Sequence, residues 1–66
     1  MTLGEKIRRL REEKGLKQQD IADILSLSRV AVTNYEGGKR IPDVYTLKYL
    51  ADYFGVTVDY LLDEET

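Results

Sequence analysis

Four side chains between positions 29 and 34 have the chemistry that contacts the edges of DNA bases. A helical projection of this segment, at about 100° per residue, places them on one side of a helix: Arg29, Val30, Thr33 and Asn34. Arginine pairs with guanine through two hydrogen bonds, asparagine pairs with adenine, and a valine or threonine methyl group can contact the methyl group of thymine. The pattern indicates an exposed helix face that could enter the major groove.

Such a face needs a helix to present it and a second helix to hold that helix in place. The apolar spacing predicts a helix over about 18–25, a turn over 26–28 and a helix over 29–36, with the hydroxyl of Ser28 as its N-cap. Gly37 and Gly38 end that helix. Two helices joined by a turn of three or four residues form the helix-turn-helix unit, whose second helix lies in the DNA major groove.

The remaining segments also have helical spacing. Thr2 and Glu5 form a capping box that opens a first helix, which ends before Gly15. Asp43 opens a fourth helix that ends at Gly55, and Thr57 opens a short fifth one. We therefore predict an all-α, compact five-helix fold. It forms one domain over residues 1–66, ordered from about 2 to 62, with a loose acidic tail at 63–66.

The composition excludes several kinds of site. The 66 residues contain no cysteine and no histidine, so a disulfide, a thiolate or imidazole metal site, and Cys or His catalysis are all excluded. The Gly37-Gly38-Lys39-Arg40 segment lacks the earlier glycine and the final Ser or Thr of a nucleotide-binding phosphate loop. We expect no enzyme activity, no cofactor, no metal and no small-molecule ligand. Apolar runs of two or three residues and a charged segment after Met1 predict neither a membrane span nor a secretory signal.

The charge is divided unevenly along the chain. The total is −2, which taken alone argues against a nucleic-acid partner. Residues 1–40 contain nine Lys and Arg against six Asp and Glu, a net +3, whereas residues 41–66 contain Lys48 alone against six acids, a net −5. Two solvated faces would give the same division, so the asymmetry alone does not decide for DNA.

Three segments and several later positions carry a resemblance to a known family. The segments are Leu16-Lys17-Gln18-Gln19-Asp20-Ile21-Ala22, Leu25-Ser26-Leu27-Ser28-Arg29 and Tyr35-Glu36-Gly37-Gly38-Lys39-Arg40. Pro42, Leu50-Ala51, Phe54-Gly55-Val56 and Asp59-Tyr60-Leu61-Leu62 continue the pattern. Together they resemble the Cro/cI-type repressor family, also called XRE, over roughly residues 3–62. The resemblance implies a five-helix, lambda-repressor-like domain that binds operator DNA as a symmetric dimer and regulates transcription, in a bacterial or phage-encoded, cytoplasmic setting.

The resemblance also implies roles for individual residues. Arg29, Val30, Thr33 and Asn34 match positions that face bases. Phosphate contacts are implied for a second set: Gln18, Lys17, Ser28, Lys39 and Arg40. Gln18 would also brace the recognition helix, and Arg11 and Glu36 match a structural ion pair between the first and third helices.

Two positions depart from the family pattern. Lys17 stands where the family has Ser or Thr, so the second helix loses a side-chain cap worth about 1 kcal/mol. Ser26 stands in the turn where the family favours glycine, and a left-handed backbone there would cost roughly 1–2 kcal/mol.

The last third of the chain suggests protein contacts. The short terminal helix contains many apolar residues for its length, namely Val58, Leu61 and Leu62. We therefore predict a two-fold homodimer interface there. Tyr45, Tyr49 and Tyr53 form one stripe on the fourth helix, suited to packing or to a protein partner. The alternative function is therefore a protein-interaction module on the same scaffold, such as an antitoxin or adaptor.

Overall fold

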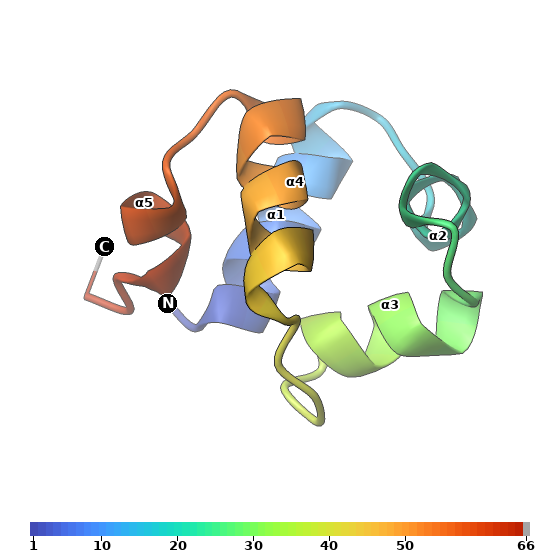
Figure 1. Ribbon diagram of the computed structural model, residues 1–66, viewed down its shortest axis with the longest axis horizontal. Helices are drawn as coiled ribbons and strands as arrows, with labels where there is room; N and C mark the ends of the chain where they lie inside the picture. The colour runs from blue at the N-terminus through green and yellow to red at the C-terminus, as the bar shows by residue number, and fades with distance from the viewer. Residues whose placement is uncertain (66) are drawn as a thin grey trace.

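The computed structural model describes residues 1–65, and within them the chain forms helices and no strand (Figure 1). The helices are α1 (Leu3–Glu13), α2 (Gln18–Leu25), α3 (Arg29–Glu36), α4 (Val44–Phe54) and α5 (Val58–Leu62). The prediction of an all-α, five-helix fold is confirmed. Thr66 and any looseness predicted for it lie outside the described residues.

One hydrophobic core lies between the helices, and every helix contributes to it. α4 supplies its largest share, because Leu47, Leu50, Ala51 and Phe54 recur at helical spacing and are all buried. In this view α4 lies in front of α1, with α5 on one side and the α2–α3 pair on the other (Figure 1). The molecule measures 28 × 23 × 21 Å, so a single core reaches all five helices.

The predicted N-caps position the helix starts. Thr2 Oγ1 accepts from the Glu5 N–H at 3.2 Å, and Glu5 Oε1 accepts from the Thr2 N–H at 2.8 Å, which completes the capping box. Ser28, Asp43 and Thr57 cap α3, α4 and α5 in the same manner. The Thr46 N–H that donates to Asp43 holds the pKa of this carboxyl below its ordinary value. The cap therefore stabilises the fold above the unfolded pKa, and this contribution is lost as pH falls through the folded pKa.

α2 begins without a side-chain cap, as the lysine at position 17 predicts. Lys17 has no side-chain acceptor, but its backbone N–H donates to Asp20 Oδ2 at 2.8 Å. The carboxylate in the first turn of α2 thus satisfies one backbone group and lies at the positive end of the helix dipole.

The turn between α2 and α3 adopts the strained backbone expected at Ser26. Ser26 has φ 57° and ψ 40°, the only non-glycine residue with positive φ among residues 1–65. Its N–H donates to Asp23 O at 3.2 Å, and the Leu27 N–H donates to Ala22 O at 2.8 Å. These two bonds close a Schellman motif, which turns the chain sharply into α3.

The Ser26→Gly variant is expected to raise the free energy of unfolding by about 0.5–1 kcal/mol. Glycine relieves the left-handed strain, and this gain exceeds the entropy that glycine adds to the unfolded chain. Urea unfolding followed by circular dichroism measures the change. Ser26→Ala is the matched control, because it removes the hydroxyl and keeps the strain; equal stability of the two variants would contradict the assignment.

A buried lysine ties α1 to the end of α5. Lys6 is 1% exposed, and its ammonium donates to the backbone carbonyls of Tyr60, at 2.5 Å, and Asp63. It also lies 4.5 Å from the centre of the Tyr60 ring. The last carbonyls of a helix have no partner within the helix, so a cation at this end satisfies them and matches the helix dipole.

The burial of α5 corrects one part of the predicted dimer interface. Leu61 is 0% exposed and packs in the core, so its side chain cannot contact a second subunit. Leu62, in contrast, is 50% exposed, and Val58 is partly buried. Only one side of so short a helix faces the core, and Leu61 occupies that side.

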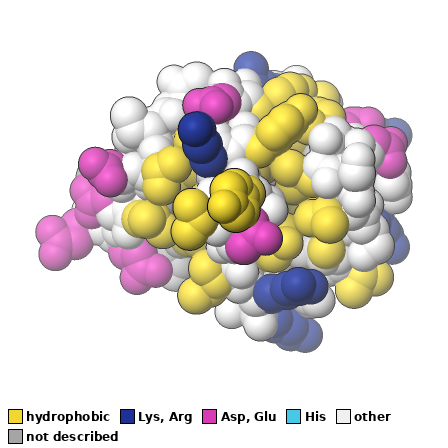
Figure 2. Space-filling view, in the orientation of Figure 1, with side chains coloured by type: hydrophobic (Ala, Val, Ile, Leu, Met, Phe, Trp, Pro, Cys, Tyr) yellow, Lys and Arg dark blue, Asp and Glu magenta, His cyan; other side chains and the backbone are white. Residues whose placement is uncertain are grey.

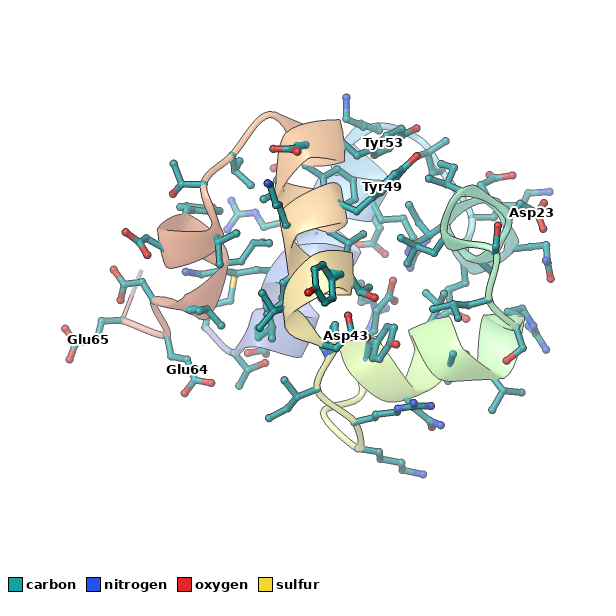
Figure 3. All side chains as sticks on the ribbon, viewed as in Figure 1. Asp23, Asp43, Tyr49, Tyr53, Glu64 and Glu65 are labelled. Carbon is teal, nitrogen blue, oxygen red and sulfur yellow. The ribbon has the colours of Figure 1, made fainter. Side chains whose placement is uncertain are left out.

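Charges separate in space as they do along the chain. Lys and Arg side chains lie at the lower edge, at the loop between α3 and α4, and at several other places on this face, whereas Asp and Glu side chains crowd the end formed by α5 and the C-terminal segment (Figure 2). Glu64 and Glu65 lie at the opposite end of the long axis from α2 (Figure 3). No helix within residues 1–65 has both the length and the apolar character needed to cross a membrane.

Candidate nucleic-acid interface

α3 lies on the surface with one side packed against the core and the other side open. Ala31, Val32 and Tyr35 are buried, as the helical projection predicts, and α2 packs against this side through Ile21 and Ala22. Because these contacts hold one side of α3 against the core, the opposite side is presented on a rigid support.

The four predicted base-contacting residues lie on the open side of α3. Val30 is 64% exposed, Arg29 and Thr33 are also exposed, and Asn34 is partly buried. Together they present a guanidinium, an amide and two methyl-bearing side chains on one helix face. The structure therefore brings these residues together, whereas contact with bases stays a prediction.

The loop after α3 folds back on the end of that helix. The backbone N–H groups of Lys39 and Arg40 both donate to the carbonyl of Asn34, at 2.9 and 3.2 Å. Both side chains are exposed. This anchoring places two cations beside the open face of α3, where the predicted phosphate contacts require them.

A chain of side-chain hydrogen bonds joins the start of α2 to α3. Gln18 Nε2 donates to Glu36 Oε1 at 3.1 Å, and Thr33 Oγ1 lies 3.0 Å from both Gln18 Oε1 and the Arg29 carbonyl. Gln18 thus braces α3 at two points. Its Nε2 has two N–H groups, and Glu36 accepts from one of them.

The hydroxyl groups on α3 are partly committed to the fold. Thr33 donates its only hydroxyl hydrogen within the protein, so it can offer a base its methyl group and the accepting lone pairs of its oxygen. Ser28 Oγ accepts from the Ala31 N–H at 3.2 Å, and this bond leaves its own hydrogen available for a phosphate oxygen. Lys17 is exposed at the start of α2, so its position is compatible with the predicted phosphate contact.

The predicted Arg11–Glu36 pair is present and lies in the protein interior. Arg11 Nε lies 2.7 Å from Glu36 Oε2, and Arg11 Nη2 lies 3.1 Å from Glu36 Oε1. The side chains are 12% and 4% exposed. The hydrogen bond to Glu36 raises the pKa of the Arg11 guanidinium above its ordinary value. Arg11 Nη1 also donates to Leu16 O at 2.8 Å, so α1, α3 and the loop before α2 meet at this pair.

Two residues of this region, Arg8 and Gly4, were not among the site residues predicted from the sequence. Arg8 lines the same shallow polar depression as Gln18 and Thr33, which adds a cation near the start of α2. Gly4 lies against the end of α3, where a Cβ would come within 2.5 Å of the carbonyl oxygens of Tyr35 and Glu36. A glycine in the first turn of a predicted helix is unusual, because glycine disfavours helices, and this feature could have pointed to Gly4. Nothing in the sequence singles out Arg8.

The chemistry of the site is that of recognition. Across the described residues 1–65, no group of three or more His, Cys, Asp or Glu side chains is placed to hold a metal ion. The site instead combines hydrogen-bond donors, methyl groups and flexible cations around one helix face, which suits a polyanion with a readable groove.

The chain matches known proteins over nearly its whole length. The family model described as helix-turn-helix matches residues 7–61. The chain is 40% identical over 65 residues to the HTH-type transcriptional activator BcrR of Enterococcus faecalis, covering 98% of this chain and 32% of that protein. It is 42% identical over 59 residues to the prophage-derived HTH-type transcriptional regulator YonR of Bacillus subtilis, covering 89% of this chain and 55% of that one. The chain thus spans between a third and about half of these relatives.

A solved structure shows the same fold. The crystal structure of the P22 c2 repressor in complex with synthetic operator 9T superposes with a TM-score of 0.88, at 27% identity and 96% coverage of both chains. The fold, the helix-turn-helix geometry and the match over residues 7–61 agree. The chain therefore belongs to the Cro/cI-type (XRE) helix-turn-helix family.

Proposed function

We propose that the chain is a sequence-specific, double-stranded DNA-binding transcriptional regulator, most simply a repressor, that contacts its operator in the major groove through α3. The observation that carries this proposal is the open face of α3, where Arg29, Val30, Thr33 and Asn34 stand together on a helix braced by α2. An α-helix fits the major groove, and these side chains match base edges there. The relatives named as transcriptional regulators support it.

The net charge determines how much of the DNA affinity comes from contacts to phosphates and how much from contacts to bases. The total of −2 predicts weak non-specific affinity, because counterion release at phosphates supplies most non-specific binding. Lys17, Lys39 and Arg40 provide the local phosphate contacts, together with the Gln18 amide and the Ser28 hydroxyl. Discrimination between sequences then depends on the few residues of α3.

We propose that the operator is an inverted repeat bound by a homodimer. Val58 and Leu62 line a groove between α4 and α5 together with Val44 and Leu47, and Val44 is 75% exposed. A two-fold dimer through this surface would present two α3 helices to half-sites with centres about 34 Å apart. Sedimentation that gives a monomer at tens of micromolar, both with and without operator DNA, would count against the dimer.

Selection of bound duplexes from a random pool, at a stated salt concentration, tests the proposed function. The expected result is one enriched inverted repeat whose affinity falls steeply with added salt. Absence of any enriched sequence would favour the protein-interaction alternative, an antitoxin or adaptor on the same scaffold. We place the protein in the cytoplasm, where bacterial and phage regulators act on DNA.

Two alanine variants are expected to weaken DNA binding in different ways. Arg29→Ala should weaken binding to the selected duplex by about 1–3 kcal/mol and relax the preference at one base pair per half-site. Lys39→Ala should weaken binding to all duplexes alike and reduce the salt slope by about one. Fluorescence anisotropy with the selected and single-substituted duplexes, at several salt concentrations, measures both effects. The assignment fails if Arg29→Ala weakens all duplexes equally.

A further inference from the structure

A shallow polar depression lies where α1, the start of α2 and the end of α3 meet. Its lining comes from all three helices and the residue after α3: Arg8, Arg11, Gln18, Thr33, Glu36 and Gly37. Gln18 and Thr33, which are hydrogen-bonded to each other, belong to the proposed DNA-binding face. The depression therefore borders that face, and Arg8 is a cation at its edge that the proposed DNA contacts do not include.

The geometry of α1 places Arg8 beside the end of α3. Gly4, Arg8 and Arg11 recur at i, i+4 and i+7, so they lie on one side of the helix. Gly4 lies against the last carbonyl groups of α3, and Arg11 pairs with Glu36. Both neighbours of Arg8 on this side thus contact the end of α3. Arg9 lies about 100° further around α1 and does not line the depression.

Arg8 is the excess cation of the depression. Arg11 and Glu36 neutralise each other at 2.7 Å, so the guanidinium of Arg8 gives the lining its net positive charge. Gln18 adds a neutral donor, because Glu36 accepts from one N–H of its Nε2 and leaves the second for a ligand. A guanidinium beside an amide N–H suits a phosphate group, whose oxygens accept several hydrogen bonds.

The present partner of Arg8 is a carboxylate of its own helix. Arg8 Nε lies 3.4 Å from Glu12 Oε2, and the two side chains are 64% and 56% exposed. An exposed ion pair of this spacing contributes little to stability and is screened by salt, so Arg8 can leave Glu12 at little cost. A phosphodiester accepts two parallel N–H bonds from a guanidinium, and neutralising it also releases counterions from the DNA.

We propose that Arg8 and the Gln18 amide form a phosphate site at the edge of the groove that α3 enters, and that Arg8 exchanges Glu12 for a phosphate of the DNA backbone when the chain binds. This inference rests on the proposed DNA-binding function and adds α1 to its contacts. Glu12 then lowers the affinity for DNA, because it competes for Arg8 in the free protein and repels the phosphate in the complex.

α1 contains a matched control pair for this site, one residue further along the chain. Arg9 Nε lies 3.5 Å from Glu13 Oε2, and these side chains are 64% and 60% exposed. Arg8→Ala should weaken binding to the selected duplex about fivefold and reduce the slope of log affinity against log salt by about 0.9, whereas Arg9→Ala should stay within about twofold. Glu12→Gln should strengthen binding about twofold, and Glu13→Gln should leave it nearly unchanged. Fluorescence anisotropy of the complete chain at several salt concentrations measures these effects.

Neutral methylphosphonate linkages in the duplex identify the phosphate itself. Each linkage around a half-site is replaced in turn, and the affinity is measured for the unchanged chain and both arginine variants. One linkage per half-site should weaken the unchanged chain and Arg9→Ala about fivefold, but Arg8→Ala less than about twofold. A purely structural role of Arg8 would not make the protein insensitive to one particular linkage. Circular dichroism and thermal unfolding should be the same for all three chains, since both arginines are exposed.

Three outcomes would overturn the phosphate site. They are equal effects of Arg8→Ala and Arg9→Ala, equal effects of Glu12→Gln and Glu13→Gln, and an Arg8→Ala variant that stays as sensitive as the unchanged chain to every linkage. The proposed DNA-binding function would survive each of them, because the unchanged chain would still bind the selected duplex. Failure of the unchanged chain to bind any duplex would overturn both.

Discussion

Replacing Glu36 by alanine is expected to lower the free energy of unfolding by about 3–5 kcal/mol. The Glu36 side chain is 4% exposed and accepts hydrogen bonds from Arg11 and Gln18. Its removal leaves the Arg11 guanidinium, itself 12% exposed, without its counter-charge in the protein interior. A domain of this size has a total stability of only about 3–10 kcal/mol, so the variant should be largely unfolded or close to it.

Urea unfolding followed by circular dichroism measures this loss, and a double variant provides the control. Arg11→Met with Glu36→Leu removes both charges and retains most of the volume, so it should recover most of the lost stability. The alternative outcome, in which the double variant is as unstable as Glu36→Ala, would show that packing and not the uncompensated charge determines the effect. The loss of the Glu36 side chain also affects the proposed DNA-binding face, because Glu36 positions Gln18.

Replacing Gly4 by alanine is expected to destabilise the protein by about 3 kcal/mol, the upper part of the range for an overpacked site. The added Cβ would lie 2.5 Å from the carbonyl oxygens of Tyr35 and Glu36, and backbone oxygens cannot move aside as a flexible side chain can. α1 and α3 must then separate. The shift displaces the end of α3, so DNA affinity should fall as well.

Gly37→Ala is the matched control for this substitution. A Cβ at Gly37 has one close neighbour, Thr33 O at 3.2 Å, and the backbone there has an ordinary negative φ of −83°. Its cost should stay below about 1 kcal/mol. Thermal and urea unfolding of both variants give the comparison. A loss at Gly4 no larger than that at Gly37 would mean that α1 and α3 can adjust without cost.

The features predicted from the sequence are those set by local chemistry. The caps at Thr2, Ser28, Asp43 and Thr57 follow from one side chain and the N–H three residues later, so they can be recognised in any short window. The open and buried sides of α3 follow from helical periodicity in the same way. The left-handed backbone at Ser26 followed only from the resemblance to the family, which favours glycine at this position of the turn.

Contacts between distant segments could not be predicted in the same way. Lys6 is 54 residues from Tyr60, and nothing near it indicates that a lysine caps the last helix. Gly4 and the end of α3 meet only when α1 packs across α3. In α5, the sequence places two leucines side by side, and only the packed structure shows that Leu61 faces inward while Leu62 faces outward.

The measurement that tests the central claim most directly is the amide proton–nitrogen correlation spectrum of the chain, titrated with the duplex obtained by selection. The proposal predicts the largest changes along residues 28–34, with further changes at Gln18 and at the Lys39–Arg40 loop. The exposed tyrosines of α4 (Tyr45, Tyr49 and Tyr53) should change little, because they lie outside the proposed DNA contact. Unchanged signals along α3 at saturating duplex, with changes centred on α4 or on the acidic C-terminal segment, would contradict major-groove recognition by this helix.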